Sequence, residues 1–280
     1  MIKLATLAMM ALGLATCHKV PPYDGEYHQK QAMMNKKFES FTHDIKGQAL
    51  HGVHAGEACN PAIIFIHGTP GDWKAWGRYL GDEELGRKAF MIAVDRPGFA
   101  GSDGGIPETQ FKKQALAIIT AAQKEHKGPF LLVGHSYGGP IQMQIALDFP
   151  NAVSGMIVLA GAIDPVLQTS RWYHYAGNTW LARNLLPQAL NVATKEMLSL
   201  PDELANQRAK LKDVTAHTTI IQGSKDWLVP PGNTAYARKQ LRNAPLEIID
   251  LPKQGHFIPW EQYDLVKSTI LKNLPEGQCL

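Results

Sequence analysis

Six nearly continuous apolar runs recur along this chain of 280 residues. Runs of this kind are typical of strands buried on both faces of a parallel sheet, because neither face then needs polar side chains. Parallel strands also require a crossover segment between them, which is usually a helix. The predicted strands cover residues 62–66, 89–94, 130–134, 155–161, 218–223 and 246–251.

Helical patterns fill most of the gaps between these runs. In residues 111–127, for example, Ala115, Ile118, Ile119 and Ala122 share one broad face. Strands that alternate with helices predict an α/β protein with a mostly parallel central sheet flanked by helices. The other predicted helices cover residues 137–149, 234–241 and 261–274, and a β-hairpin is expected over residues 41–55.

One long segment interrupts the alternation. Residues 165–214 contain no strand-like run, but they hold helical patterns at 180–186 and 202–211. Because this segment lies between two predicted strands, we expect a helical cap inserted over one end of the sheet. The predicted domains are therefore a core of residues 41–163 and 215–280 and a cap of residues 164–214.

The composition is that of an ordinary globular protein. Hydrophobic residues make up 45% of the chain and charged residues 19%, which excludes a disordered chain. The formal net charge is +3 and no Lys/Arg run stands out, so nucleic acid is not an expected partner.

The N-terminus has the pattern of an export signal. Lys3 precedes an apolar run over residues 4–14, which is too short to span a bilayer as a helix. The next residues, ending at Cys17, resemble a bacterial lipoprotein box, with Thr16 where a smaller residue is usual. An ordinary cleaved signal peptide is the alternative. The resemblance implies a signal peptide over residues 1–17, a lipid anchor on Cys17, a tether over residues 18–40, and export to a bacterial membrane, facing the periplasm or the cell exterior.

A serine between glycines follows the third predicted buried strand. The sequence from Gly134 to Gly138, GHSYG, lies between that strand and a predicted helix, at the sheet edge where ligands bind in such folds. The two glycines fit a sharp turn that leaves no room for other side chains and exposes the serine hydroxyl. We therefore predict that Ser136 is a catalytic nucleophile.

A serine hydroxyl needs a base, and the base needs a carboxylate that orients it. In this architecture the three follow in the order Ser, Asp or Glu, His. Asp226 follows the strand over residues 218–223 and His256 follows the last predicted strand, so both should lie at the sheet edge that carries Ser136. Asp164, after the strand over residues 155–161, is the alternative acid.

Acyl transfer also needs hydrogen-bond donors for the negative oxygen that develops on the substrate. The backbone N–H of Tyr137, directly after the nucleophile, is one predicted donor. The other should come from the loop after the first buried strand, and we assign it to the N–H of Thr69.

Five motifs along the chain resemble those of the α/β-hydrolase fold family. They read HGTPGD, DRPGFAGSD, GHSYGG, GSKDWLVP and GHF, and the match spans about residues 41–274. The resemblance implies a helical cap after the sixth strand and a structural turn over residues 95–102. The catalysis it implies needs no metal or other cofactor. Haloalkane dehalogenases and epoxide hydrolases are similar in the first motif, but they need an aspartate where this chain has Ser136.

Aromatic residues of the predicted cap give the clue to the substrate. Trp172, Tyr173, Tyr175 and Trp180 are expected to line an apolar pocket for a small molecule. Such a pocket favours carboxylic esters with small to medium apolar acyl or aryl groups. The alternative is that these side chains simply pack the cap onto the sheet.

Three other functions remain open. HGTPG resembles the HGGPG of proline iminopeptidases, which read a free amine through cap carboxylates, but Glu196, Asp202 and Glu203 are expected to be ordinary helix-surface acids. A C–C bond hydrolase would use the same triad. A non-catalytic, lipid-anchored binding protein is the alternative of another class, although no residue of the predicted triad is missing.

The chain has three cysteines, and Cys59 and Cys279 remain once Cys17 is assigned to a lipid. Cys59 precedes the first buried strand, and the last helix should end near Cys279 at the same edge of the sheet. We therefore predict a disulfide between them. His51 and His54 have no set of Cys, Asp or Glu nearby, so no metal site is predicted.

Overall fold

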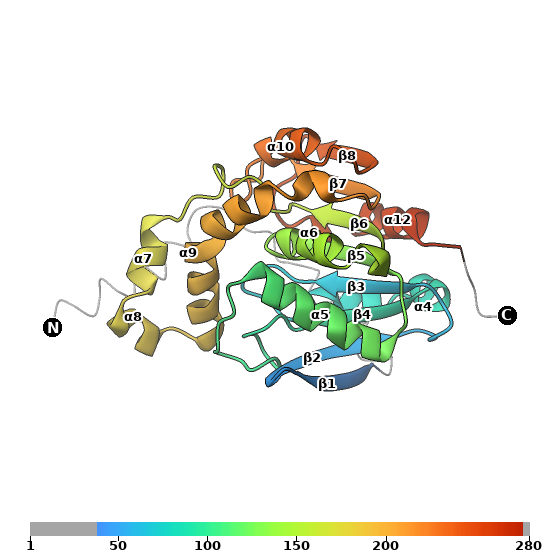
Figure 1. Ribbon diagram of the computed structural model, residues 1–280, viewed down its shortest axis with the longest axis horizontal. Helices are drawn as coiled ribbons and strands as arrows, with labels where there is room; N and C mark the ends of the chain where they lie inside the picture. The colour runs from blue at the N-terminus through green and yellow to red at the C-terminus, as the bar shows by residue number, and fades with distance from the viewer. Residues whose placement is uncertain (1–37, 277–280) are drawn as a thin grey trace.

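A computed structural model describes residues 38–276, and within them the chain forms an eight-stranded sheet (Figure 1). Its strand order is β1-β2-β4-β3-β5-β6-β7-β8. The first two strands form an antiparallel hairpin, and β3 to β8 run parallel to one another. The predicted fold class is therefore confirmed. The strands are β1 (Glu39–Ile45), β2 (Gln48–Ala55), β3 (Ala62–Ile66), β4 (Phe90–Val94), β5 (Phe130–His135), β6 (Val153–Leu159), β7 (Thr218–Gly223) and β8 (Leu246–Leu251).

The central strands are buried on both faces, as their apolar runs predicted. Every residue of β3, β4 and β5 is buried. Successive side chains of a strand point to opposite faces, so β3 supplies Ile64 and Ile66 to one core and Ile63 and Phe65 to the other. The edge strand β8 is mostly half-buried.

Helices cover both faces of the sheet (Figure 1). Residues of α5, α6 and α10 pack in one core, and residues of α3, α4, α11 and α12 pack in the other. The sequence did not predict α3 and α4, because helices of this length carry too few residues for a periodic pattern. The bounds are α3 (Gly77–Leu80), α4 (Glu83–Lys88), α5 (Phe111–Glu125), α6 (Gly138–Asp148), α10 (Gly232–Gln240), α11 (Ile258–Glu261) and α12 (Tyr263–Asn273).

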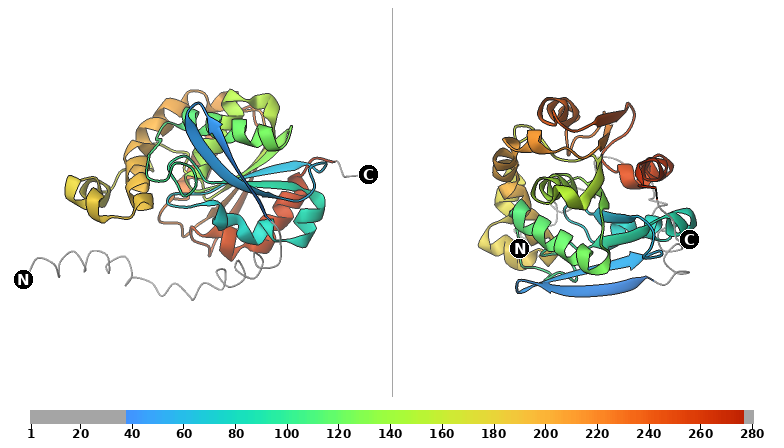
Figure 2. Two further views of the ribbon diagram at one scale, coloured as in Figure 1. Left: turned by 90° about the horizontal axis from the view of Figure 1, so that it is seen from below. Right: turned by 45° about the vertical axis from the view of Figure 1, so that its right-hand side comes forward.

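A helical insertion between β6 and β7 forms the cap. It contains α7 (Trp172–Gly177), α8 (Trp180–Leu185) and α9 (Gln188–Arg208). The long helix α9 packs Leu200 and Leu204 into the core, whereas α7 and α8 stand out from the body of the molecule (Figure 2). The sequence predicted a helix over residues 202–211, whereas α9 begins at Gln188, ends at Arg208 and contains Pro201. None of the helices in residues 38–276 combines the length and apolarity that crossing a membrane requires.

Candidate active site

Ser136 stands at the sharp turn between β5 and α6. Its φ is +54°, in the left-handed region that residues other than glycine rarely adopt. The flanking glycines are required by space, because a Cβ at Gly134 would lie 2.7 Å from the carbonyl oxygen of Gly138. A Cβ at Gly138 would lie 2.4 Å from the carbonyl oxygen of Ile66. The turn therefore needs both glycines and leaves the serine half-buried rather than packed.

Asp226 and His256 are joined by a buried hydrogen bond. The distance from His256 Nδ1 to Asp226 Oδ2 is 2.7 Å, and the two residues are 6% and 4% exposed. Asp226 Oδ1 accepts the backbone N–H groups of Leu228 and Val229 at 2.9 and 2.8 Å, which fixes the carboxylate in the loop after β7. With the Nδ1 proton donated to Asp226, the Nε2 atom of His256 is the basic one.

His135 connects His256 to the serine turn. It immediately precedes Ser136, and its ring lies 4.7 Å from the ring of His256. Its Nε2–H donates to the carbonyl oxygen of His256 at 3.0 Å. Burial, and next the neighbouring His256, hold the pKa of His135 well below its ordinary value, so the ring is neutral. The sequence alone indicated no role for His135, which occupies the variable position of the motif.

The structure thus brings the loops of the three predicted triad residues to one edge of the sheet. In residues 38–276 the Ser136 hydroxyl has no hydrogen-bond partner. Such contacts are often loose before a substrate binds. The alternative acid, Asp164, uses Oδ1 to accept the N–H of Val166 at 2.8 Å, and its carboxylate has no bond to His256 within the described chain.

The two predicted oxyanion donors are free. Across the described residues, neither the N–H of Thr69 nor that of Tyr137 has an acceptor. The loop after β3 lies directly against the serine turn, since a Cβ on Gly68 would come within 3.0 Å of Ser136 Cβ. Free backbone donors beside a nucleophile can stabilise a developing negative oxygen.

A fully buried arginine holds that loop in place. The Nε and one terminal nitrogen of Arg96 donate to the carbonyl oxygens of His67 and Gly68, at 2.9 and 3.0 Å. The backbone N–H of Arg96 donates to His67 Nε2 at 2.9 Å, and His67 Nδ1–H donates to Gly68 O at 2.7 Å. Burial, and next the charge of Arg96, hold the pKa of His67 well below its ordinary value. The His67 ring is therefore neutral, and it links the Arg96 N–H to the Gly68 carbonyl oxygen by hydrogen bonds.

Glu196 of the cap neutralises this arginine. Its two carboxylate oxygens lie 2.5 and 3.0 Å from the two terminal nitrogens of Arg96, and both side chains are 0% exposed. The expectation that Glu196 is a helix-surface acid is therefore wrong, because α9 packs this face against the core. Glu203 is half-buried and accepts the N–H of Phe111 at 2.9 Å, whereas Asp202 is exposed as expected.

The loop after β4 forms the turn that the family motif implied. Asp95 is buried and accepts the backbone N–H groups of Trp73 and Gly101 at 2.8 and 3.0 Å. Its Oδ2 also lies 2.7 Å from His51 Nδ1, so His51 braces this turn. His54, the second histidine of this strand, lies with its Nε2 3.3 Å from Oε2 of Glu125, at the end of α5.

The four aromatic side chains predicted to line a pocket are exposed on the surface of the cap. Trp172, Tyr173, Tyr175 and Trp180 are 68%, 39%, 62% and 74% exposed. They lie on α7 and at the start of α8, on the part of the cap that stands out from the body (Figure 2). The pocket assignment stays a prediction.

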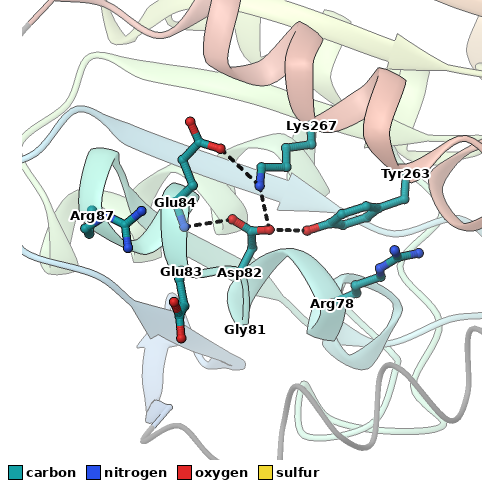
Figure 3. A pocket seen from close by; sticks show the side chains of 8 residues that line it. All are labelled: Arg78, Gly81, Asp82, Glu83, Glu84, Arg87, Tyr263 and Lys267. Atoms are coloured by element: carbon teal, nitrogen blue, oxygen red, sulfur yellow. Dashed lines mark hydrogen bonds and ion pairs between the residues drawn. The ribbon is translucent and has the colours of Figure 1, made fainter.

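A polar hollow lies elsewhere, between α3, α4 and α12 (Figure 3). Three of its charged groups pair with one another, since Lys267 Nζ lies 2.9 Å from Asp82 and 3.1 Å from Glu84. The hydroxyl of Tyr263 donates to Asp82 at 2.6 Å. None of these helices carries a predicted catalytic residue, so we assign this hollow no function.

The signal peptide, Cys17, most of the tether and Cys279 lie outside the described residues. Cys59 is disulfide-bonded. Its partner also lies outside the described residues, so the pairing with Cys279 stays a prediction.

Comparison with known proteins places this geometry in a family. The model described as "Alpha/beta hydrolase family" matches residues 63–268, and the chain belongs to that family. It is 29% identical to epoxide hydrolase 4 of Mus musculus over 115 residues, which is 40% of this chain and 32% of that protein. The match therefore spans about a third of that curated relative.

Solved structures share the fold. The Cif epoxide hydrolase of Acinetobacter nosocomialis is similar with a TM-score of 0.71 and 17% identity, covering 92% of this chain and 98% of that one. A putative aryl esterase from Burkholderia cenocepacia is similar with a TM-score of 0.69 and 19% identity, covering 84% and 97%.

Proposed function

We propose that this hydrolase is a serine esterase that cleaves carboxylic esters of small to medium apolar acyl or aryl groups through an acyl-enzyme. The observation that carries the proposal is the buried His256–Asp226 hydrogen bond beside a serine held at a positive φ. A buried, oriented imidazole near a serine hydroxyl that is not packed away is the arrangement that activates a serine for acyl transfer.

The proposed reaction has two stages. Ser136 Oγ attacks the ester carbonyl while His256 Nε2 takes its proton, and the N–H groups of Thr69 and Tyr137 bind the resulting oxyanion. His256 then gives the proton to the leaving alcohol, which leaves an acyl group on Ser136. Water, activated by His256, releases the acid and restores the serine. Asp226 orients the imidazole and stabilises its positive form.

Two other reactions fit this site less well. Epoxide hydrolases need an aspartate nucleophile, and the residue at the turn is Ser136. A proline-iminopeptidase-like reaction would need a free cap carboxylate for the substrate amine. Two of the three candidates are already bound, Glu196 by Arg96 and Glu203 by the Phe111 N–H, and the third, Asp202, is exposed. A C–C bond hydrolase would use the same triad. The structure therefore does not distinguish it from an esterase, and hydrolysis of ester substrates does.

The test is hydrolysis of p-nitrophenyl esters of increasing acyl length, with Ser136→Ala beside the parent chain. Ser224→Ala is the matched control, because Ser224 is an exposed serine at the same sheet edge. We expect turnover that is lost in Ser136→Ala and kept in Ser224→Ala. Turnover that survives in Ser136→Ala, or an absence of ester turnover in the parent, would reject the proposal.

The export assignment remains a separate proposal. We propose that Cys17 is acylated and holds the protein at a bacterial membrane, and that Cys59 pairs with Cys279. Mass spectrometry of the protein purified from its membrane fraction tests both. The expected results are an acylated N-terminal Cys17 and a Cys59–Cys279 linked peptide. An unmodified Cys17 or a different linkage would overturn the corresponding assignment.

A further inference from the structure

Exposed apolar side chains concentrate on one part of the molecule. Among the residues that the structure describes, eleven large apolar side chains are exposed, and eight of them lie between residues 166 and 190. On α8 alone, Trp180, Leu181 and Leu185 are all more than half exposed. A surface of this kind usually meets a partner, because leaving it in water is unfavourable.

The charges of the same segment are of one sign. Residues 165–195 contain no aspartate or glutamate, although the whole chain has 25, and the cations there are Arg171, Arg183 and Lys195. Trp and Tyr favour the interface between water and lipid, because one end of each ring is apolar and the other polar. Cations beside them are attracted by anionic headgroups, and acids would be repelled. The charge complementarity therefore points to an anionic bilayer.

This surface adjoins the catalytic loops. Arg171, at the start of α7, donates to the carbonyl oxygen of Trp227 at 3.0 Å, and its guanidinium lies 5.5 Å from the Trp227 ring. Trp227 directly follows Asp226. Phe257 directly follows His256, and both Trp227 and Phe257 are exposed. A bilayer that meets the cap would therefore lie near the loops that carry Asp226 and His256.

We propose that α7 and α8 form a membrane-docking surface that inserts its aromatic and leucine side chains into the interface of an anionic bilayer. This docking surface is separate from the proposed lipid anchor at Cys17, and it does not depend on the proposed ester chemistry. The shallow insertion expected of such a surface is reversible and is weakened by salt.

The test uses the full chain with Cys17→Ala, which cannot be acylated at that position, and vesicles of equal phosphatidylglycerol and dibromo-phosphatidylcholine. Bromine quenches the fluorescence of tryptophans that enter the bilayer, so Trp172 and Trp180 report insertion of the cap itself. The variant Leu181→Asp/Leu185→Asp alters the surface without touching the catalytic residues. Ile106→Asp is the matched control, since Ile106 is 65% exposed and lies outside the cap.

We expect quenching in the parent and in Ile106→Asp, and at least a tenfold weaker apparent vesicle affinity for the double variant. Arg183→Glu should weaken binding to the anionic vesicles several-fold, whereas Lys239→Glu, on α10, should not. Replacing Trp172 and Trp180 with phenylalanine should remove most of the quenching and keep the binding.

Three results would overturn the proposal. The first is equal quenching in the parent and the double variant, or none in the parent. The second is a parent that is dimeric in solution and does not bind vesicles, with a monomeric double variant, because a second copy would then cover the surface. The third is a double variant whose KM for soluble p-nitrophenyl esters differs from that of the parent while its quenching by the vesicles is the same as the parent's. The surface would then be an acyl-binding subsite.

Discussion

Arg96 and Glu196 form a two-pronged ion pair, fully buried between the loop after β4 and the cap helix α9. The same guanidinium donates to the carbonyl oxygens of His67 and Gly68, next to the proposed oxyanion donor Thr69. One cation thus connects the cap to the loop beside the nucleophile. A shift of α9 at this point would therefore disturb the contacts that hold the loop beside the nucleophile.

Glu196→Gln should destabilise the fold strongly, because it leaves the charge of Arg96 buried without a counter-charge. Removing one partner of a buried pair costs about 3–5 kcal/mol. Glu203→Gln is the control on the same helix, since it weakens a single hydrogen bond worth about 1 kcal/mol. Urea unfolding followed by circular dichroism measures both. Equal losses of unfolding free energy in the two variants would mean that the Arg96–Glu196 ion pair contributes no more to stability than a single hydrogen bond.

Asp226→Asn should lower kcat for a p-nitrophenyl ester by about 10⁴-fold, because an amide no longer selects the required tautomer of His256 or stabilises its positive form. Asp164→Asn should leave kcat within about twofold, since the carboxylate of Asp164 contacts Val166 rather than His256. Steady-state kinetics of the two variants decide between the acids. A larger loss in Asp164→Asn would reverse the assignment.

Gly138→Ala should destabilise the protein by at least about 1–3 kcal/mol, because the added carbon would meet the carbonyl oxygen of Ile66 at 2.4 Å. Gly155→Ala is the matched change in β6, where the nearest atoms would lie at 3.4 Å. We expect its effect to be clearly smaller. Thermal unfolding of both variants tests the space requirement at the serine turn, and a Gly138→Ala protein as stable as Gly155→Ala would refute it.

The free energy of unfolding should fall in mild acid. His67 and His135 have pKa values well below the ordinary 6.5 in the folded state, so below that pH the unfolded chain binds more protons than the folded one. Stability is then complete above about pH 6.5 and is lost as pH falls, by up to about 1.4 kcal/mol per pH unit for each ring. Urea titrations from pH 7 to 5 measure the slope. His135→Gln should lower the slope of the unfolding free energy against pH by up to about 1.4 kcal/mol per pH unit. An unchanged slope would mean that burial does not keep His135 neutral in the folded state.

The sheet could be predicted from the sequence because strands buried on both faces of a parallel sheet consist almost entirely of apolar residues. The predicted runs at 62–66, 218–223 and 246–251 match β3, β7 and β8 to the residue. The motifs around Ser136, Asp226 and His256 were predictable because each follows the carboxyl end of a strand, and the topology then brings those ends together. Local sequence and strand order were sufficient there.

The contacts around the site were not predictable in the same way. Nothing local marks Glu196 as buried, since it becomes so when α9 packs against a loop about 100 residues earlier in the chain. The roles of His67 and His135 likewise depend on which carbonyl oxygens the fold places beside their rings. A signal did exist for Arg96, because it lies in the DRPG motif that follows the strand next to the oxyanion loop.

The most direct test of the proposed chemistry is to label the full chain with a fluorophosphonate, which reacts with activated serines, and to locate the adduct by mass spectrometry of its peptides. We predict a single adduct on Ser136, which is lost in Ser136→Ala, strongly slowed in Asp226→Asn, and unchanged in Ser224→Ala. An unlabelled Ser136 in a chain that still hydrolyses esters, or a label on another serine, would contradict the proposed nucleophile.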